Sequence, residues 1–281
     1  MFDSELQSET VNAASGHGTI RADSAVRAAF ATVDDRTHVA RVYECGSLRV
    51  RFPRGPSCEA VLLNTGGGIT GGDQLDVRLS LGPGAAVVAT SQAAEKLYRS
   101  DGPPAKIAVR ANLADGARLD WLPQESILFD RVNVERTLDI DMAATARLTM
   151  LEALMLGRTA HGESLGDARW RDRWRIRRGN ALVLAENVRL DGAISDQMQR
   201  PALGAGARCV ATLVHVAPDA EWRLDEVRNA LQNATSCCGC SAWNGMLVAR
   251  FAAVELHKLR GEMVAAVMIL TRAPMPRAWS C

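Results

Sequence analysis

The sequence predicts a mainly β protein with a few helices towards its C-terminus. From Arg21 onwards, apolar and polar residues alternate with a period of two. Turn-forming residues interrupt this alternation about every 8 to 12 residues. Apolar residues at helical spacing occur only after Pro218. The pattern therefore favours an all-β core with helices added at one end, and it argues against alternating βαβ units.

The expected strands follow one another along most of the chain. They cover residues 39–43, 48–52, 61–63, 75–81, 85–90, 107–113, 119–121, 132–140, 148–156, 170–178 and 181–185. Pro53 ends one of them, and Asp115-Gly116 forms a turn between two others. Such closely spaced short strands are typical of a single β core.

The C-terminal part of the chain mixes helices with one strand. Leu224, Val227 and Leu231 have helical spacing, and acidic residues lie in the first turn, where they favour the helix dipole. Residues 245–252 form an expected strand, and residues 255–270 form a longer helix that stops before Pro274. We expect one domain over residues 21–281, with a β core to about residue 217 and a mixed segment over 218–281.

The composition is that of an ordinary globular protein. The 281 residues are 47% hydrophobic, and the net charge is +1. So small a charge creates no overall field that would attract nucleic acid or an anionic membrane. Residues 1–20 lack the basic start and apolar centre of a secretory signal. We expect a disordered tail there, in a cytoplasmic protein with neither nucleic acid nor membrane as a partner.

Five glycines lie between Gly66 and Gly72, and their spacing satisfies a dinucleotide-binding pattern. That pattern needs a helix directly after the glycines, whose N-terminus holds the pyrophosphate. The residues after Asp73 alternate with a period of two instead, and no Lys-Ser/Thr pair follows as in a Walker loop. The segment predicts a glycine-rich connection between two strands, with an NAD-binding site as the alternative.

The segment Trp170–Arg178 alternates apolar residues with charged residues, most of them basic. Tryptophans interleaved with arginines can stack nucleobases, which would indicate an RNA-binding module. The nearly neutral chain favours a half-buried strand with one charged face.

The cysteines Cys237, Cys238 and Cys240 include one Cys-x-x-Cys spacing. A structural zinc site would need a second pair at a fixed distance, and none exists in the sequence. A redox motif would need a strand before it and a helix after it, whereas residues 241–245 resemble a turn. A plain loop is the interpretation that the sequence favours.

Carboxylates in apolar surroundings are the other candidate site residues. Glu152 lies within the apolar run 148–156, where an ionised carboxylate needs a partner or a function. The five histidines are isolated, and neither a metal-hydrolase spacing nor a nucleophile elbow is present. The residues alone leave open whether Glu152 is functional, is half of a buried ion pair, or points outward from its strand.

Four segments together carry a family resemblance. They are Asn64-Thr-Gly-Gly-Gly-Ile-Thr-Gly-Gly-Asp73, Ser91-Gln-Ala-Ala-Glu-Lys-Leu-Tyr-Arg-Ser100, Trp121-Leu-Pro-Gln-Glu-Ser-Ile-Leu-Phe129 and Leu156-Gly-Arg-Thr-Ala-His-Gly-Glu163. In this order and spacing the chain resembles the urease accessory protein family UreD, also called UreH, from about Arg21 to Trp279. One glycine motif alone is weak evidence, but four motifs in register are specific. The cysteine cluster is not a feature of this family.

The resemblance implies a maturation factor that is not an enzyme. Members of the family help to insert nickel into apo-urease together with UreF and the GTPase UreG. It also implies an irregular superhelical, β-helix-like assembly of many short strands, with helices towards the C-terminus. Nickel would be an ion in transit through an internal channel, and no cofactor would be tightly bound.

The resemblance also assigns functional residues. The family's acidic positions are filled here by Asp73, Glu152 and Glu186, which are expected to guide nickel. The first two motifs are expected to contact partners through Gly67, Gly68, Gly71, Gly72, Gln92, Lys96, Tyr98 and Arg99. An NAD-binding oxidoreductase using Gly66–Gly71 and a basic-strand RNA-binding module remain the rival functions.

Overall fold

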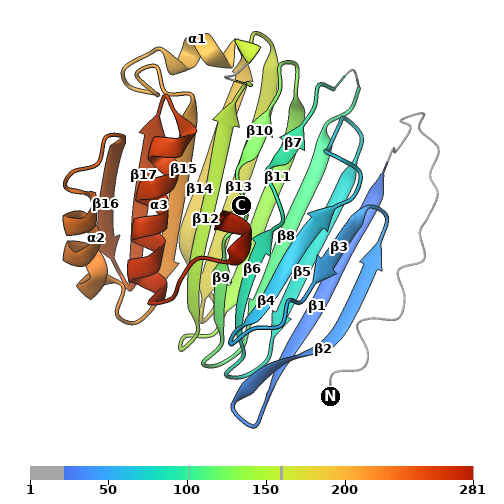
Figure 1. The fold of residues 1–281 in the computed structure, drawn as a ribbon, viewed down its shortest axis with the longest axis vertical. Helices are drawn as coiled ribbons and strands as arrows, with labels where there is room; N and C mark the ends of the chain where they lie inside the picture. Colours follow the sequence, from blue (N-terminus) through green and yellow to red (C-terminus); the bar gives the residue numbers. More distant parts are fainter. Residues whose placement is uncertain (1–21, 101, 159–160, 281) are drawn as a thin grey trace.

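The computed structural model describes residues 22–100, 102–158 and 161–280. Its strands form two sheets that pack face to face (Figure 1). Sheet A has seven strands in the order β14-β13-β11-β8-β5-β1-β2. Sheet B has the order β16-β17-β15-β12-β9-β6-β4-β3, and two short strands lie off this path, since β10 pairs with β12 and β7 pairs with β10. The expected tail over residues 1–20 lies outside the described residues.

The elements have the following bounds. The strands are β1 (Asp23–Val33), β2 (Arg36–Cys45), β3 (Leu48–Arg51), β4 (Cys58–Asn64), β5 (Gln74–Leu81), β6 (Ala86–Ser91), β7 (Glu95–Leu97), β8 (Ala105–Leu113), β9 (Arg118–Trp121), β10 (Ser126–Leu128), β11 (Asn133–Met142), β12 (Arg147–Leu156), β13 (Ala168–Arg178), β14 (Ala181–Gly192), β15 (Cys209–Val216), β16 (Cys237–Trp243) and β17 (Met246–Ala253). The helices are α1 (Ile194–Met198), α2 (Leu224–Leu231) and α3 (Leu256–Thr271), with single 3-10 turns at η2 (Glu221–Arg223) and η3 (Arg277–Ser280).

The chain winds as a flattened superhelix, because its longer strands alternate between the two sheets. From β4 to β13 the path runs from sheet B to sheet A and back, once for each turn of the coil. Strands of this run pair in parallel with their neighbours in the same sheet. Parallel pairing follows because each strand reaches the next strand of its own sheet only after a crossing. The predicted mainly β, β-helix-like assembly with C-terminal helices is therefore confirmed.

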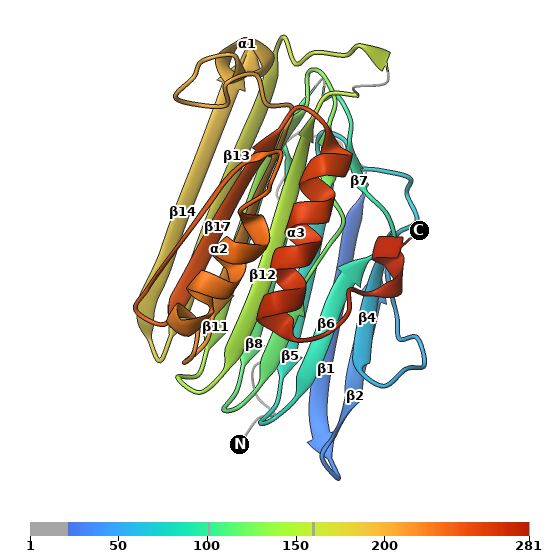
Figure 2. The same ribbon diagram turned by 60° about the vertical axis from the view of Figure 1, so that its left-hand side comes forward.

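Two hydrophobic cores hold these layers together. The larger core fills the space between the sheets, where strands such as β5 alternate buried and outward-facing side chains. The smaller core lies between the outer face of sheet B and the helices α2 and α3 (Figure 2). Strand β12 is buried on both faces because it lies between the two cores. This position explains the continuous apolar run of its sequence.

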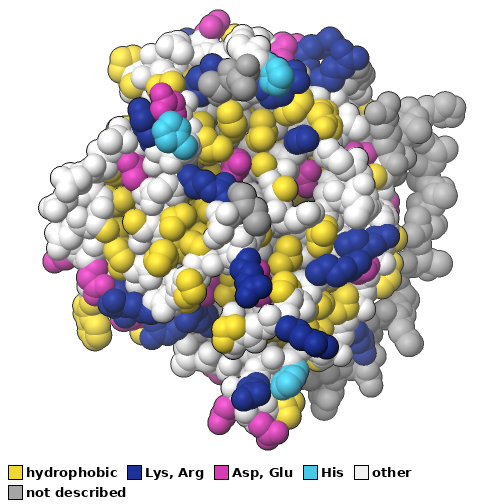
Figure 3. Space-filling view, in the orientation of Figure 1, with side chains coloured by type: hydrophobic (Ala, Val, Ile, Leu, Met, Phe, Trp, Pro, Cys, Tyr) yellow, Lys and Arg dark blue, Asp and Glu magenta, His cyan; other side chains and the backbone are white. Residues whose placement is uncertain are grey.

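Hydrophobic side chains also reach the surface on the face that carries the C-terminal helices (Figure 3). Met268 of α3 is 44% exposed, and Trp222 in η2 is 82% exposed. None of the described helices is long and apolar enough to cross a membrane.

Two local predictions are wrong. The cysteine segment is the edge strand β16 and not a loop, because it pairs with β17 along its whole length. The turn is confined to Asn244 and Gly245, which have positive φ angles of 52° and 71°. Strand β14 does not end at residue 185 but continues to Gly192, since it pairs with β13 over that length. Pairing partners decide both cases, and a sequence window does not contain them.

Candidate functional site

The four sequence motifs meet at one end of the superhelix. The glycine loop connects β4 to β5 with no helix between them, as predicted. Two backbone hydrogen bonds join it to the second motif, from Ile69 N to Lys96 O at 2.8 Å and from Tyr98 N to Ile69 O at 2.7 Å. The Tyr98 hydroxyl also donates to the Gly67 carbonyl at 3.1 Å. The glycine loop is thus hydrogen-bonded to β7 and to Tyr98, which follows β7.

Gly68 allows this close approach because it has no side chain. Its φ angle is 144°, and a Cβ atom there would overlap the ring of Tyr98 and lie 2.8 Å from Lys96 O. At Gly71 a Cβ atom would overlap the side chain of Ser100. By contrast, a Cβ atom at Gly67 would meet nothing within 4 Å. Bare glycine is therefore a packing requirement at Gly68 and Gly71.

The third and fourth motifs complete the cluster around Phe129. Tyr98 and Phe129 pack edge to face with ring centroids 4.9 Å apart. The guanidinium of Arg158 lies 4.5 Å from the centroid of the same phenyl ring. Glu163 accepts hydrogen bonds from Arg158 N and Nε at 3.0 and 2.9 Å, and this guanidinium lowers the pKa of Glu163. The structure brings all four motifs into one surface, which we call the loop cluster.

Most of the predicted partner-contact residues lie in or beside the loop cluster. Gln92 and Lys96 line a small cavity beneath the glycine loop, together with Gly67 and Gly68. The Arg99 carbonyl accepts from the Thr70 hydroxyl at 2.9 Å, which fastens the loop on its other side. Gly72 is buried with a φ angle of 87°. Their contact with a partner stays a prediction.

Two cavities lie between the sheets. The larger has a volume of about 910 Å³ and opens between β14 of sheet A and β16 of sheet B. The smaller has a volume of about 280 Å³ and lies under the loop cluster. Among the described residues, Arg136 and Glu152 are the two that line both cavities. These two side chains therefore separate the cavities.

Arg136, Glu152 and Asp172 form a buried ion cluster, and each is at most 6% exposed. Arg136 of β11 donates from Nε and Nη2 to the two carboxylate oxygens of Asp172, its register partner on β13, at 3.0 and 2.5 Å. Its Nη1 donates to Glu152 of β12 in the opposite sheet. Glu152 also accepts from Trp121 Nε1 at 2.7 Å. Of the interpretations that the sequence left open, the structure rules out an outward position for Glu152 and shows the buried ion pair, and the nickel role of Glu152 stays a prediction.

Burial and pairing act in opposite directions on the charges of this cluster. Burial raises the pKa of Glu152, and the Arg136 guanidinium opposes that rise. Burial alone would lower the pKa of Arg136, but Asp172 and Glu152 raise it above its ordinary value. Arg136 therefore stays cationic, and the Trp170 ring supports it with its centroid 4.9 Å from the guanidinium carbon.

The structure brings two of the three predicted nickel residues to one cavity. Glu186 of β14 lines the larger cavity with Glu152, and it pairs with Arg250 of β17 across the opening. Asp73 instead lies in the glycine loop, where its Oδ2 accepts from Thr70 N at 2.8 Å. Asp73 does not line either of these two cavities. Its place in a nickel path stays a prediction.

Glu95 lies in the second motif, and the sequence assigns it no function. Glu95 lines the smaller cavity, and Asn64 Nδ2 donates to its two oxygens at 3.2 and 3.3 Å. Burial raises its pKa to about 7, which the hydrogen bond from Asn64 only partly offsets. Its position inside the molecule follows from the pairing of β7 with β10, which no local pattern indicates.

The cysteines of β16 form no metal site in the part of the chain that the structure describes. No group of three or more His, Cys, Asp or Glu residues there has the arrangement of a metal site. Cys238 and Cys240 share the face of β16 that packs on the smaller core, and burial raises the pKa of both thiols. Cys238 and Cys240 therefore act as core residues of an edge strand, whereas Cys237 is exposed.

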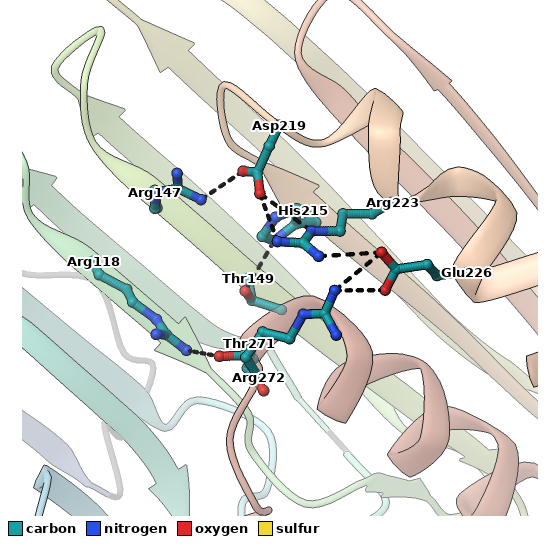
Figure 4. Close-up of polar contacts among 9 residues, drawn as sticks. All are labelled: Arg118, Arg147, Thr149, His215, Asp219, Arg223, Glu226, Thr271 and Arg272. Carbon is teal, nitrogen blue, oxygen red and sulfur yellow. Dashed lines mark hydrogen bonds and ion pairs between the residues drawn. The ribbon is translucent and has the colours of Figure 1, made fainter.

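On the outer face of sheet B, charged side chains fasten the helices to the strands (Figure 4). Asp219 accepts from Arg147 of β12 at 2.6 Å and from Arg223 at 2.9 Å. Glu226 of α2 accepts from Arg223 at 3.3 Å and from Arg272, at the end of α3, at 2.7 Å. The network joins both helices to the sheet that walls the cavities.

His215 of β15 lies behind this network and is 3% exposed. Its Nδ1 lies 3.1 Å from the Thr149 hydroxyl. Burial lowers the pKa of His215 to about 4, and the guanidinium of Arg147 acts in the same direction. The imidazole is therefore neutral at neutral pH, which makes His215 a core residue.

The rival functions do not fit this arrangement. A dinucleotide site needs a helix after the glycines, and strand β5 stands there instead. Base stacking needs accessible rings, whereas Trp170 and Trp174 of β13 are 0% and 4% exposed. The half-buried strand predicted for residues 170–178 is confirmed.

The fold and the site define a wound β scaffold that encloses two cavities and carries a cluster of motifs at one end. Over residues 22–280 the chain matches the family model described as UreD urease accessory protein. The chain belongs to this family.

Relatives of the same description cover most of the chain. It is 46% identical over 261 residues to the urease accessory protein UreD of Xanthobacter autotrophicus, covering 92% of this chain and 90% of the relative. It is 43% identical over 262 residues to that of Azorhizobium caulinodans, covering 92% and 97%. It is 48% identical over 248 residues to the urease accessory protein UreD 1 of Methylobacterium radiotolerans, covering 86% of each.

Proposed function

We propose that this chain is a urease maturation factor that assembles with UreF, UreG and apo-urease and conducts nickel between its two sheets. The observation that carries the proposal is the pair of cavities that meet at one buried ion cluster. Glu152 and Glu186 line the larger cavity, and Glu95 and Glu152 line the smaller one. Family membership supports a role in urease maturation.

The chemistry of the cavity walls suits a metal ion in transit. Nickel(II) accepts carboxylate oxygens, water and imidazole as ligands, and ligand type and geometry set the selectivity of a site. A closed shell of thiolates would trap the ion. In this chain the carboxylates are spread along the cavities and already have protein partners. Such a wall offers an ion successive weak contacts and no resident site.

The loop cluster supplies a surface for partner proteins. Tyr98, Phe129 and Arg158 form a packed aromatic and cationic group at the end of the superhelix that contains the smaller cavity. Aromatic and arginine side chains are the types that contribute most at protein interfaces. We assign GTP hydrolysis to the partner UreG, since the glycine loop here lacks the lysine of a phosphate-binding loop.

Filling the larger cavity tests the proposed passage. Gly239 of β16 lines this cavity, and a Cβ atom on it would meet nothing within 4 Å. Gly239→Trp should therefore place a large side chain in the cavity with little strain. Gly261→Trp is the matched control, because Gly261 has the same open surroundings on the exposed side of α3.

We expect Gly239→Trp to keep its thermal stability and its assembly with UreF, UreG and urease. Urease matured with it should carry less nickel by elemental analysis than urease matured with Gly261→Trp. Full nickel content with a correctly folded Gly239→Trp variant would exclude passage through this cavity.

A further inference from the structure

The buried ion cluster has an asymmetric construction. Arg136 makes two hydrogen bonds to Asp172 within sheet A, and both residues lie on paired strands. Within sheet B, Glu152 is held by Trp121 from β9, which pairs with β12. The bond from Arg136 Nη1 to Glu152 is the link of this cluster that spans the gap between the sheets.

Breaking the hydrogen bond between Arg136 and Glu152 should cost less free energy than breaking the pair of Arg136 with Asp172. The pair with Asp172 is a two-bond fork, the geometry in which guanidinium binds carboxylate best. The Trp170 ring also belongs to sheet A and keeps the guanidinium on that side. Arg136 therefore has a complete binding position on sheet A when its bond to Glu152 is broken.

The guanidinium also occupies the position that a cation would need. It carries one positive formal charge against two negative ones, and it uses the Glu152 oxygen that faces it. A divalent cation in either cavity meets this positive charge in surroundings of low dielectric, where repulsion is strong. While the bond is intact, Glu152 cannot offer that oxygen to an ion.

We infer that Arg136 is the gate between the two cavities, and that the gate opens when Arg136 releases Glu152 and stays on Asp172. This inference rests on the proposed passage of nickel and adds its regulation to it. The gated ligand is a hydrated divalent cation, and Glu152 is the carboxylate that becomes available to it.

Nickel binding by the purified full chain tests the gate without any partner protein. The variant Arg136→Gln/Asp172→Asn removes the guanidinium and its anchor but keeps the formal charge of the cluster and its approximate volume. Equilibrium dialysis with Ni²⁺ should show that this variant binds nickel at least about tenfold more tightly than the wild type does. Adding Glu152→Gln should abolish the gain. Arg110→Gln is the control, because it removes a guanidinium that lines neither cavity from Asp76, which keeps Arg78 as its partner.

Circular dichroism identifies a variant that has not folded. If Arg136→Gln/Asp172→Asn does not fold, nickel binding is measured with Arg136→Lys instead, because lysine keeps the charge but cannot form the two-bond fork. We expect a smaller gain in nickel affinity from this variant. Unchanged binding in the folded variants, or a gain that persists after Glu152→Gln, would overturn the gate. The nickel content of urease matured with Gly239→Trp reports on the passage itself, so the two proposals fail separately.

Discussion

Neutralising Glu152 measures how much the buried ion cluster contributes to stability. Glu152→Gln keeps the size of the side chain but removes its charge, and Gln has one carbonyl oxygen for two donors, Trp121 Nε1 and Arg136 Nη1. Its amide NH₂ group must face one of these donors. We therefore expect one donor to lose its acceptor in a region that is at most 6% exposed.

The expected cost follows from the remaining contacts of Arg136. Removing one partner of a buried ion pair costs about 3 to 5 kcal/mol. Asp172 still neutralises the guanidinium through two hydrogen bonds, which places the cost near the lower value, at about 3 kcal/mol. For a domain of this size we expect the melting temperature to fall by about 6 °C or more.

Urea and thermal unfolding of the purified chain measure this cost. Glu186→Gln is the control, since Glu186 pairs with Arg250, whose side chain is 55% exposed. A pair of this kind contributes under about 1 kcal/mol, so the control should stay close to the wild type. If Glu152→Gln is as stable as Glu186→Gln, the cluster does not have the buried, fully bonded form described above.

Two further predictions concern the glycine loop and the buried histidine. Gly68→Ala should destabilise the chain by about 2 kcal/mol more than Gly67→Ala in urea unfolding, because only at Gly68 does the new Cβ atom overlap Tyr98; equal losses would show that the loop is a tolerant connection. His215 has its pKa lowered to about 4, so its contribution to stability is complete above pH 6.5 and is lost as the pH falls towards 4. Between pH 7 and 4 the free energy of unfolding of the wild type should therefore fall by about 3 kcal/mol more than that of His215→Leu, and identical pH dependence would contradict the burial of a neutral imidazole.

The loop cluster illustrates how much of the site the sequence indicates. The absence of a helix after Asp73 follows from the alternation of Leu75, Val77 and Leu79, because this period fits a strand alone. The four motifs also indicate the family. Their meeting around Phe129 could not be predicted from local patterns, since it depends on the register of strands far apart in the chain.

The sequence by itself determined the mainly β class, the C-terminal helices and the unusual setting of Glu152. Periodicity and runs of apolar residues are local properties, so they can be read along the chain. Only the tertiary structure decided that the cysteine segment is an edge strand, and that Arg136, held by Asp172, neutralises Glu152. The physical reason is that a superhelix places each strand beside the strand one turn away, and a buried charge takes its partner from that neighbour or from the facing sheet.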